Sequence, residues 1–450
     1  MADDLRAFFD FTLLAAPKIA AAPLSTKLTM TSRFRLWLRS LGPGLITGAA
    51  DDDPSGIATY SQAGAQYGFG MLWTLPFTYP LMVSIQIISA RIGRVTGRGL
   101  AANLRLNYPQ WVALPLVLLL LMANTINIAA DITAMADAVH LVAGGPSHVY
   151  AVAFGMLCLL LQIFIPYERY VRVLKWLTLS LFAYVGTLFF VHVPWTTVVL
   201  DTLWPKIEHT NDYLGLVVSI FGTTISPYMF FWQAGQEVEE MGRRPRIIAL
   251  MRSPAEAAHH LARIRLDTLL GMGFSQAVAF FIMLTTAVTL HVHGISDIQT
   301  SAQAAAALRP IAGDYAFALF ATGIVGTGFL AVPVLAGSAA YAVAEFFRWR
   351  TGLGLKPEAA KGFYSIIAIS TLLGVLLDFS SIDPIKALLW SAMINGVVAV
   401  PLMAVMMHMS GREKMMGRFV GSPRLRWMGW LATGIMALAT VMFGITNWYH

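Results

Sequence analysis

The sequence is poor in charged residues and nearly free of cysteine. Asp, Glu, Lys and Arg make up 12% of its 450 residues, whereas hydrophobic residues make up 57%. A soluble domain of this length carries about twice that share of charge, so the composition indicates a membrane protein. The single cysteine, Cys158, excludes an internal disulfide and is expected to be a small apolar core residue. The first 30 residues contain Asp3, Asp4 and Asp10 and lack the pattern of a cleaved signal peptide.

Long apolar runs are abundant. A run of about 20 residues can cross a bilayer as a helix. We predict eleven spans, at approximately 43–66, 70–93, 110–141, 148–166, 171–193, 213–240, 266–291, 312–346, 363–379, 384–408 and 425–447.

The distribution of basic residues predicts the orientation of these spans. If the N-terminus is cytoplasmic, the outer side holds only Lys206, Arg309 and Lys386 of the 31 Lys and Arg residues. Basic residues favour the cytoplasmic side, so we predict a cytoplasmic N-terminus and an external C-terminus. The net charge of +7 then reflects topology and contact with the lipid bilayer, and it is not evidence of nucleic-acid binding.

Two spans are interrupted by polar residues and proline. The first interruption runs from Gly48 to Gly56 (GAADDDPSG), and the second from Gly222 to Met229 (GTTISPYM). Carboxylates and prolines are costly in a bilayer, and a broken helix is tolerated there only where protein or a water-filled cavity receives it. Two such breaks in corresponding positions of two halves point to the substrate site of a transporter.

The positions of the breaks also predict the domain organisation. Pro54 interrupts the first span and Pro227 the sixth, and spans five apart run in opposite directions. Spans 1–5 and 6–10 are therefore predicted to be inverted repeats, with the eleventh helix peripheral. We predict a cytosolic arm at 1–40, a transport core at 41–410 with repeats at about 41–195 and 210–410, and a cytosolic loop with helix 11 at 411–450.

The residues at the breaks suit a hard cation. Asp53 and Ser226 each precede a proline, where helix is disfavoured, so backbone carbonyls are freed at the negative end of each first half-helix. With the Asp53 carboxylate and the Thr223 and Ser226 hydroxyls, these carbonyls form an oxygen-rich set that favours Mg²⁺, Ca²⁺ or Mn²⁺. Met229 is expected to be a packing residue. The histidines, His259 and His260 among them, are expected at span ends or in surface loops.

At these residues the sequence resembles the Nramp divalent-metal transporters, and more closely their Nramp-related magnesium transporter branch. The resemblance covers most of the chain. It is strongest at Gly42–Gly68, at Gly222–Gln233 and at Gly323–Phe346. It implies an all-α polytopic membrane protein with a LeuT-like fold, 11 transmembrane helices, a 5+5 inverted repeat and alternating access.

Departures from the main pattern of that family carry the most information. The metal-binding asparagine of the first break is replaced by Gly56, and the soft methionine ligand of the second break is replaced by Ser226. The alanine three residues earlier is Thr223, and the histidine used in proton movement is Tyr228. The aspartate of the third span has a counterpart in Asp131. The glutamate that follows it is Ala134, and the arginine pair of the ninth span is absent from 363–379.

Together these changes predict a wider and harder cavity without a proton path. Mg²⁺ gives up water reluctantly and usually keeps several waters when bound. We therefore predict a transporter that imports hydrated Mg²⁺, and also Mn²⁺, uncoupled from protons. The metal site is predicted at Asp53, Gly56, Thr223 and Ser226, with Pro54 and Pro227 as helix breaks. The alternative is a proton-coupled Mn²⁺/Fe²⁺ symporter of the Nramp type, with Asp53 and Asp131 as proton carriers.

Several further residues are candidates for a hydrated path. They are Ser55, Tyr228, Gln233, Glu237, Asp131 and Asn395. Gln233 and Glu237 lie one helical turn apart, so they either line an aqueous exit or form a solvated helix end. Asn124, Asn127 and Asp131 either face the cavity or form hydrogen bonds between helices. Asp51 and Asp52 either face an aqueous entry or solvate the start of the break.

Two other classes of function fit less well. An amino-acid symporter with Na⁺ would need exposed amides at a broken helix, where Asp53 would repel the substrate carboxylate. An intramembrane aspartyl protease would need two adjacent carboxylates and a Gly-x-Gly-Asp element, which the sequence lacks. We therefore expect no enzyme, no cofactor, and a monomer in a bacterial inner membrane whose partners are divalent metal ions and lipid.

Overall fold

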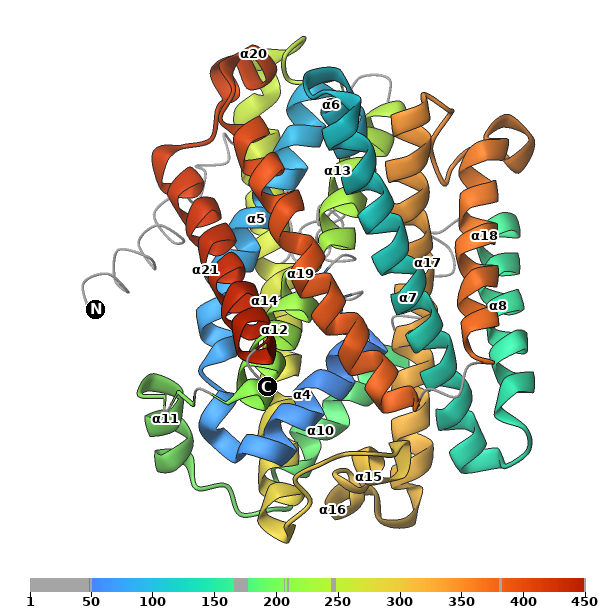
Figure 1. The fold of residues 1–450 in the computed structure, drawn as a ribbon, viewed down its shortest axis with the longest axis vertical. Helices are drawn as coiled ribbons and strands as arrows, with labels where there is room; N and C mark the ends of the chain where they lie inside the picture. The colour runs from blue at the N-terminus through green and yellow to red at the C-terminus, as the bar shows by residue number, and fades with distance from the viewer. Residues whose placement is uncertain are drawn as a thin grey trace, which may run out of the picture.

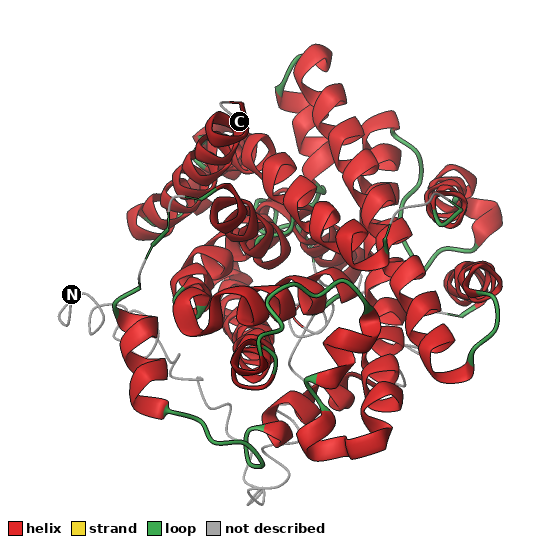
Figure 2. Ribbon diagram, turned by 60° about the horizontal axis from the view of Figure 1, so that its bottom comes forward, coloured by secondary structure: helices red, strands yellow, loops and turns green. Residues whose placement is uncertain are grey.

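The computed structural model describes Gly48 and residues 51–165, 177–205, 207–208, 210–243, 248–379 and 383–448. These residues form helices joined by turns and loops, and they contain no strand (Figure 2). The predicted arm at 1–40 lies outside the described residues. The fold class predicted from the sequence is therefore confirmed in its all-helical character.

The helices that build the body of the molecule follow one another with short connections. They are α4 (Pro54–Tyr67), α5 (Thr74–Thr96), α7 (Gln110–Ala143), α8 (Ser147–Phe164), α12 (Asn211–Thr224), α13 (Pro227–Arg243), α14 (Ala257–Thr289), α17 (Ala316–Phe347), α18 (Lys361–Leu377), α19 (Pro384–Ser410) and α21 (Pro423–Trp448).

Short helices lie between them. They are α6 (Leu100–Asn107), α10 (Phe182–Thr187), α11 (Trp195–Leu203), α15 (Ser301–Ala306), α16 (Arg309–Ala312) and α20 (Glu413–Met416). All of them except α10 lie mainly outside the predicted spans.

The number of membrane spans is the part of the prediction that the structure leaves open. Within the described residues, seven segments are long and apolar enough to cross a membrane, or eight if α4 and α5 count as one broken span. Helix α18 has 17 residues and is slightly shorter than this limit. The fifth predicted span, 171–193, contains the turn η2 (Leu177–Leu181) and α10, and its first residues lie outside the described part.

The first break separates α4 from the chain that precedes it. Asp53 is the N-cap of α4 and Pro54 is its first residue, which is where a proline is tolerated best. Helix α4 ends at Gly68, and the pair α4–α5 is bent by 110° across the turn η1 (Gly68–Met71). Helix α4 therefore crosses the lower part of the molecule at a steep angle to its neighbours (Figure 1).

The second break lies between α12 and α13. Helix α12 ends at Thr224, and Ile225 and Ser226 are non-helical before Pro227 starts α13. Gly222 lies against α19 so closely that a Cβ atom there would be 2.0 Å from the carbonyl oxygen of Ala392. Only glycine allows this approach, which holds the second break against α19.

The helix packing is reciprocal between the two halves of the chain. Helix α4 packs on α14, and α13 packs on α5, so each broken span contacts the second helix of the other half. Helix α7 packs along α17 in the centre, while α8 and α18 pair at one side and α21 covers α19, α12 and α5. The exact repeat boundaries, 41–195 and 210–410, stay a prediction.

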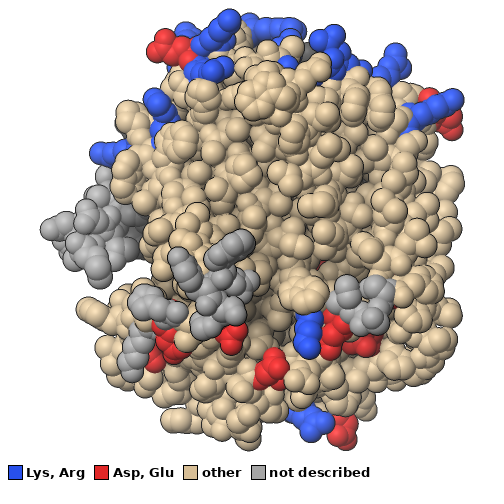
Figure 3. All heavy atoms as spheres, viewed as in Figure 1, with Lys and Arg blue, Asp and Glu red and all other residues tan. Residues whose placement is uncertain are grey.

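The two ends of the molecule differ in their surface charge. In Figure 3, Lys and Arg atoms gather at the end where Figure 1 shows α6 and α20, and few lie at the opposite end near α11, α15 and α16. The basic end includes Arg98, Arg105, Arg412 and Arg418. Between the ends the visible surface is largely free of charge, as expected for a protein surrounded by lipid.

Candidate functional site

Asp53 is the centre of the candidate site. Its side chain is 1% exposed, and its carboxylate caps the first turn of α4. Oδ1 accepts hydrogen bonds from the Gly56 backbone N–H and the Ser55 hydroxyl, each at 2.7 Å. A carboxylate at this N-cap is satisfied by its own helix, which fixes the direction in which its second oxygen points.

The second carboxylate oxygen of Asp53 joins two other helices to α4. Oδ2 accepts a hydrogen bond from Asn127 Nδ2 of α7 at 3.1 Å and a longer one from the Tyr228 hydroxyl of α13 at 3.4 Å. Asn127 Oδ1 in turn accepts from the Ser391 hydroxyl of α19 at 2.8 Å. Asn127 therefore forms hydrogen bonds between helices, which is one of the two interpretations of its polar stripe, and one of these bonds is to the carboxylate at the first break.

The second break faces Asp53 across Gly56. A Cβ atom at Gly56 would be 3.0 Å from Thr223 Oγ1 and 3.4 Å from Asp53 Oδ1, so all three residues meet at one point. Ser226 Oγ donates to the carbonyl oxygens of Gly222 and Thr223, at 2.8 and 2.7 Å. The hydroxyl proton of Ser226 is thus used by its own helix, and only its oxygen lone pairs remain for a ligand.

Two predicted residues of the wider path are buried with unsatisfied polar atoms. Asp131 of α7 is fully buried next to Asp53 and the Ser55 backbone amide, and neither of its oxygens forms a hydrogen bond of normal length and angle. Asn395 of α19 is 1% exposed, and both polar atoms of its amide lack a hydrogen bond. Buried polar groups are normally satisfied, so these atoms suit an ion, water or proton.

Asp51 and Asp52 lie against α14. Both are buried, and Ser275 Oγ lies 2.7 Å from Asp51 Oδ2 and 3.0 Å from Asp52 Oδ1. Because both side chains are buried in this structure, they neither face an aqueous entry nor lie at a solvated start of the break. Together with Asp53 and Asp131 they give four buried carboxylates, and none of the four is ion-paired to a basic side chain among the described residues.

Gln233 and Glu237 lie on the buried side of α13. Both are 1% exposed, and Glu237 forms ion pairs with Arg94 at 3.7 Å and with Arg263 at 3.1 Å. Arg263 also binds Glu240, at 2.7 Å. Glu237 is therefore buried in an ion-pair network rather than exposed at a solvated helix end.

Two side chains of this region are buried by ion-pair partners, and for His260 this contradicts the sequence expectation. Arg94 lies in the last turn of α5 with no exposed surface. His260 was expected at the surface, but its ring is mostly buried and Nδ1 lies 2.7 Å from Arg94 Nη2. In both cases a tertiary ion-pair network holds the side chain inside, which the positions in the chain do not reveal.

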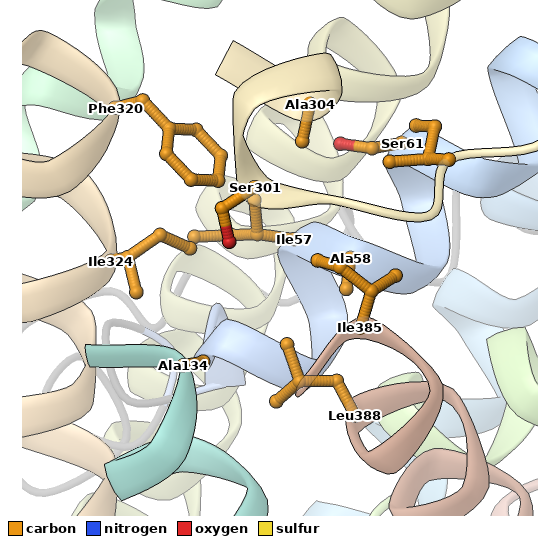
Figure 4. Close-up of a pocket in the computed structure, with 11 residues that line it drawn as sticks. Ile57, Ala58, Ser61, Ala134, Ser301, Ala304, Phe320, Ile324, Ile385 and Leu388 are labelled. Atoms are coloured by element: carbon orange, nitrogen blue, oxygen red, sulfur yellow. The ribbon is translucent and has the colours of Figure 1, made fainter. Parts of the chain in front are cut away.

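A small apolar pocket adjoins the site on the side of α15. It is lined by side chains of α4, α7, α15, α17 and α19, and it has room for about one water molecule (Figure 4). Leu388 lies in its lining, and the carbonyl oxygen of Leu388 accepts a hydrogen bond from Ser391. Asp53 is therefore separated from the end with few basic residues by apolar side chains.

The sequence missed some of the residues that complete the site. Ser275 bonds to the carboxylates before the first break and Ser391 bonds to Asn127, but both serines lie in apolar helices without an unusual pattern. Asn127 was detected only as part of a polar stripe. Among the described residues, no group of three or more His, Cys, Asp or Glu side chains is arranged to hold a metal, so a cation here would use hydroxyl, carbonyl or water oxygens as well.

Comparison of the whole fold finds solved structures with a similar arrangement of helices. The manganese transporter of Eremococcus coleocola, solved with an aromatic bis-isothiourea compound, has a TM-score of 0.72 at 17% identity, over 92% of this chain and 87% of that one. Mhp1, a nucleobase-cation-symport-1 family transporter, gives a TM-score of 0.57 at 13% identity over 90% of both chains. At these identities the likeness shows the fold alone, which is the LeuT-like fold.

Comparison of the sequence gives the family. The family described as natural resistance-associated macrophage protein-like (Nramp) matches residues 44–446, and the protein belongs to this family. Its relatives include a divalent metal cation transporter of Verminephrobacter eiseniae, 25% identical over 84% of this chain and 87% of the relative. Another is the divalent metal cation transporter of Mycobacterium tuberculosis H37Rv, 25% identical over 92% of both chains.

Proposed function

We propose that this protein imports divalent metal cations across a membrane by alternating access, with Mg²⁺ as well as Mn²⁺ as substrates, and without proton coupling. The observation that carries the proposal is the set of groups around Asp53. Among the described residues, this buried carboxylate at two helix breaks has only neutral hydrogen-bond partners, so it suits a mobile cation. Membership of the Nramp family and relatives named as divalent metal cation transporters support the same class of substrate.

The small size of Gly56 and the hard oxygen of Ser226 favour a hydrated ion. Gly56 has no side chain where it faces Asp53 and Thr223, and Ser226 has its hydroxyl directed into α12. A cation in this space would be held by Asp53 directly and by the other groups through water, which costs little free energy when the water keeps its hydrogen bonds. Mg²⁺ retains its water and tolerates such a site, while Mn²⁺ also accepts oxygen ligands.

The membrane potential supplies a driving force for uptake without a second ion. An inside-negative potential of 100 mV is worth about 2.3 kcal/mol per unit charge, and about twice that for a divalent cation. The Nramp pattern has a histidine and a glutamate that serve proton movement, and this chain has Tyr228 and Ala134 at those two positions. Uncoupled import is the simplest mechanism that fits these residues.

One observation favours a second candidate, a proton-coupled Mn²⁺/Fe²⁺ symporter. Asp131 is buried beside Asp53, and its carboxylate forms no hydrogen bond of normal geometry. Such a carboxyl group can hold a proton that leaves when a cation binds nearby. Under this alternative, protons would enter in step with the metal.

We propose that the basic end of the molecule faces the cytoplasm. The gathering of Lys and Arg at the α6 and α20 end supports this orientation, a cytoplasmic N-terminus and an external C-terminus. The apolar pocket beside α15 then lies on the outer side of Asp53, and the Glu237–Arg263 pair lies on the inner side. A monomer in a bacterial inner membrane remains part of the proposal.

Uptake into liposomes tests the proposal. Purified protein is reconstituted, an inside-negative potential is applied, and luminal Mg²⁺ and luminal pH are recorded together. Mg²⁺ entry without acidification is expected. Acidification in proportion to metal entry would establish the symporter, and an absence of both Mg²⁺ and Mn²⁺ entry would contradict metal transport.

A further inference from the structure

The chain just before the first break lies tightly against α14. A Cβ atom at Gly48 would be 2.2 Å from the carbonyl oxygen of Gly271, so the two backbones touch there. Ser275 lies one helical turn beyond Gly271, on the same face of α14, and Asp51 and Asp52 both reach it. Two consecutive carboxylates are thereby placed on one hydroxyl group inside the protein.

The two carboxylates share too few hydrogen-bond donors. Ser275 has one hydroxyl proton, which it can donate to Asp51 Oδ2 at 2.7 Å or to Asp52 Oδ1 at 3.0 Å, but not fully to both. Asp51 Oδ1 has no hydrogen-bond partner among the described residues, although Asp51 is 1% exposed. Two buried carboxylates that share one donor require a further positive partner.

Asp51 and Asp52 lie on the side of Asp53 that faces the basic end of the molecule. Helix α4 starts at Pro54, next to Asp53, and runs toward the end of the molecule where α15 lies, so the residues that precede Asp53 lie on the other side of the break. Helix α14 begins at Ala257 near the basic end, and Thr268, two turns before Ser275 on the same face, is buried with an unsatisfied Oγ1. Oxygen atoms therefore continue along α14 from the break toward the basic end.

We propose that Asp51, Asp52 and Ser275 form a second divalent-cation site, which receives the ion after it leaves Asp53 on the way to the cytoplasm. This inference rests on the proposed function, since it assumes that Asp53 binds the transported cation. Two carboxylates balance the charge of a divalent ion, and water completes its coordination shell, as Mg²⁺ and Mn²⁺ allow. Mutual repulsion of two divalent ions so close together favours occupation of the two sites in turn.

Equilibrium binding of Mn²⁺ to the purified protein tests this site apart from transport. The free Mn²⁺ concentration is read from its electron paramagnetic resonance signal. In the Asp53→Asn variant, saturable Mn²⁺ binding is expected to remain, weakened by no more than about 10-fold. In the triple variant Asp53→Asn, Asp51→Asn, Asp52→Asn, saturable binding is expected to be lost. Size-exclusion elution and thermal unfolding confirm that each variant is folded.

A gain of binding provides the second measurement. Ser275→Cys, made in the Asp53→Asn background, places a soft sulfur ligand in the second site and is expected to raise Cd²⁺ affinity at least 10-fold. Ser84→Cys is the matched control, because Ser84 is also a buried helix serine but bonds a carbonyl of its own helix. Equal Cd²⁺ affinity in both cysteine variants would overturn the proposal.

The remaining outcomes separate this inference from the proposed function. If wild-type protein binds and transports Mn²⁺ but Asp53→Asn abolishes all binding, the second site does not exist while metal transport stands. If Asp51→Asn and Asp52→Asn change only the number of protons released on binding, measured calorimetrically in two buffers, the pair holds a proton and the cation site is refuted. If wild-type protein neither binds nor transports metal, the proposed function itself fails.

Discussion

Two clusters of buried carboxylates in this protein differ in how their charge is balanced. Around α13, the carboxylates of Glu237 and Glu240 are matched by Arg94 and Arg263. At the first helix break, Asp51, Asp52, Asp53 and Asp131 share only hydroxyl, amide and backbone N–H groups among the described residues.

The counter-charge of the α13 cluster is a fixed part of the protein, whereas the counter-charge of the cluster at the break is mobile. Desolvating a carboxylate is expensive, and a guanidinium that is part of the protein offsets that cost permanently. A cluster without such a partner is stable only when a proton or a cation visits it. The cluster at α13 is therefore expected to maintain structure, and the cluster at the break to bind the transported ion.

The largest expected effect follows from removing the centre of the second cluster. Asp53→Ala should reduce Mg²⁺ and Mn²⁺ uptake into liposomes more than about 100-fold, because the carboxylate that bonds to Tyr228 across the two breaks is lost. The protein should still elute as a folded species. Asp314→Asn, an exposed change at the α16 end, is the control and should transport normally. Near-normal uptake by Asp53→Ala would remove Asp53 from the site.

Removal of a positive charge from the cluster around α13 should lower the stability of the protein. Arg263→Leu leaves Glu240 and Glu237 with Arg94 alone, and breaking a buried ion pair costs about 3–5 kcal/mol, with the lower end expected here because Arg263 is partly exposed. Thermal unfolding in detergent measures the loss. Adding Glu237→Gln and Glu240→Gln should restore part of it, while the exposed Arg252→Leu should change nothing. Unchanged stability in Arg263→Leu would mean that the pair is not structural.

A smaller effect is expected on ion selectivity. Ser226→Met adds a soft sulfur at the second break and should shift the ratio of Mn²⁺ or Cd²⁺ to Mg²⁺ transport upward by about 10-fold. Competition of each metal against a fixed Mn²⁺ concentration measures the ratio. Ser219→Met, about two turns earlier and within α12, is the control for size alone. A selectivity that does not change would count against Ser226 as part of the site.

The smallest effect is expected from narrowing the space between the breaks. Gly56→Ala places a methyl group 3.0 Å from Thr223 Oγ1 and 3.4 Å from Asp53 Oδ1. A hydrated ion needs this space, so the KM for Mg²⁺ should rise a few-fold and more than that for Mn²⁺, which loses water more readily. Concentration series of uptake for both ions give the comparison. Equal changes for the two ions would indicate general strain instead.

The sequence predicted the parts of this structure that depend on local chemistry. The Asp53–Pro54 and Ser226–Pro227 pairs predicted where two spans break, because proline at the first turn of a helix and a non-helical residue before it follow from backbone sterics. The long apolar runs predicted where α7, α17 and α19 begin and end to within a few residues. These features need only neighbouring residues for their explanation.

The contacts that complete the clusters could not be predicted in the same way. Asn127 lies 74 residues from Asp53, Ser275 lies 224 residues from Asp51, and Ser391 lies 264 residues from Asn127. A serine or asparagine in an apolar helix has many possible partners, and only the packing of α4 against α14 and α7 selects one. Arg94 is a similar case, because its burial depends on α13 and α14.

The position of a bound Mn²⁺ ion tests the contrast between the two clusters most directly. Crystals grown with Mn²⁺ give an anomalous signal that locates the ion. The signal is expected at the break, within about 2.2 Å of an Asp53 carboxylate oxygen or about 4 Å if a water lies between them, and not beside Glu237. An ion bound between Glu237 and Glu240, with Asp53 unliganded, would contradict the assignment of the fixed and mobile counter-charges.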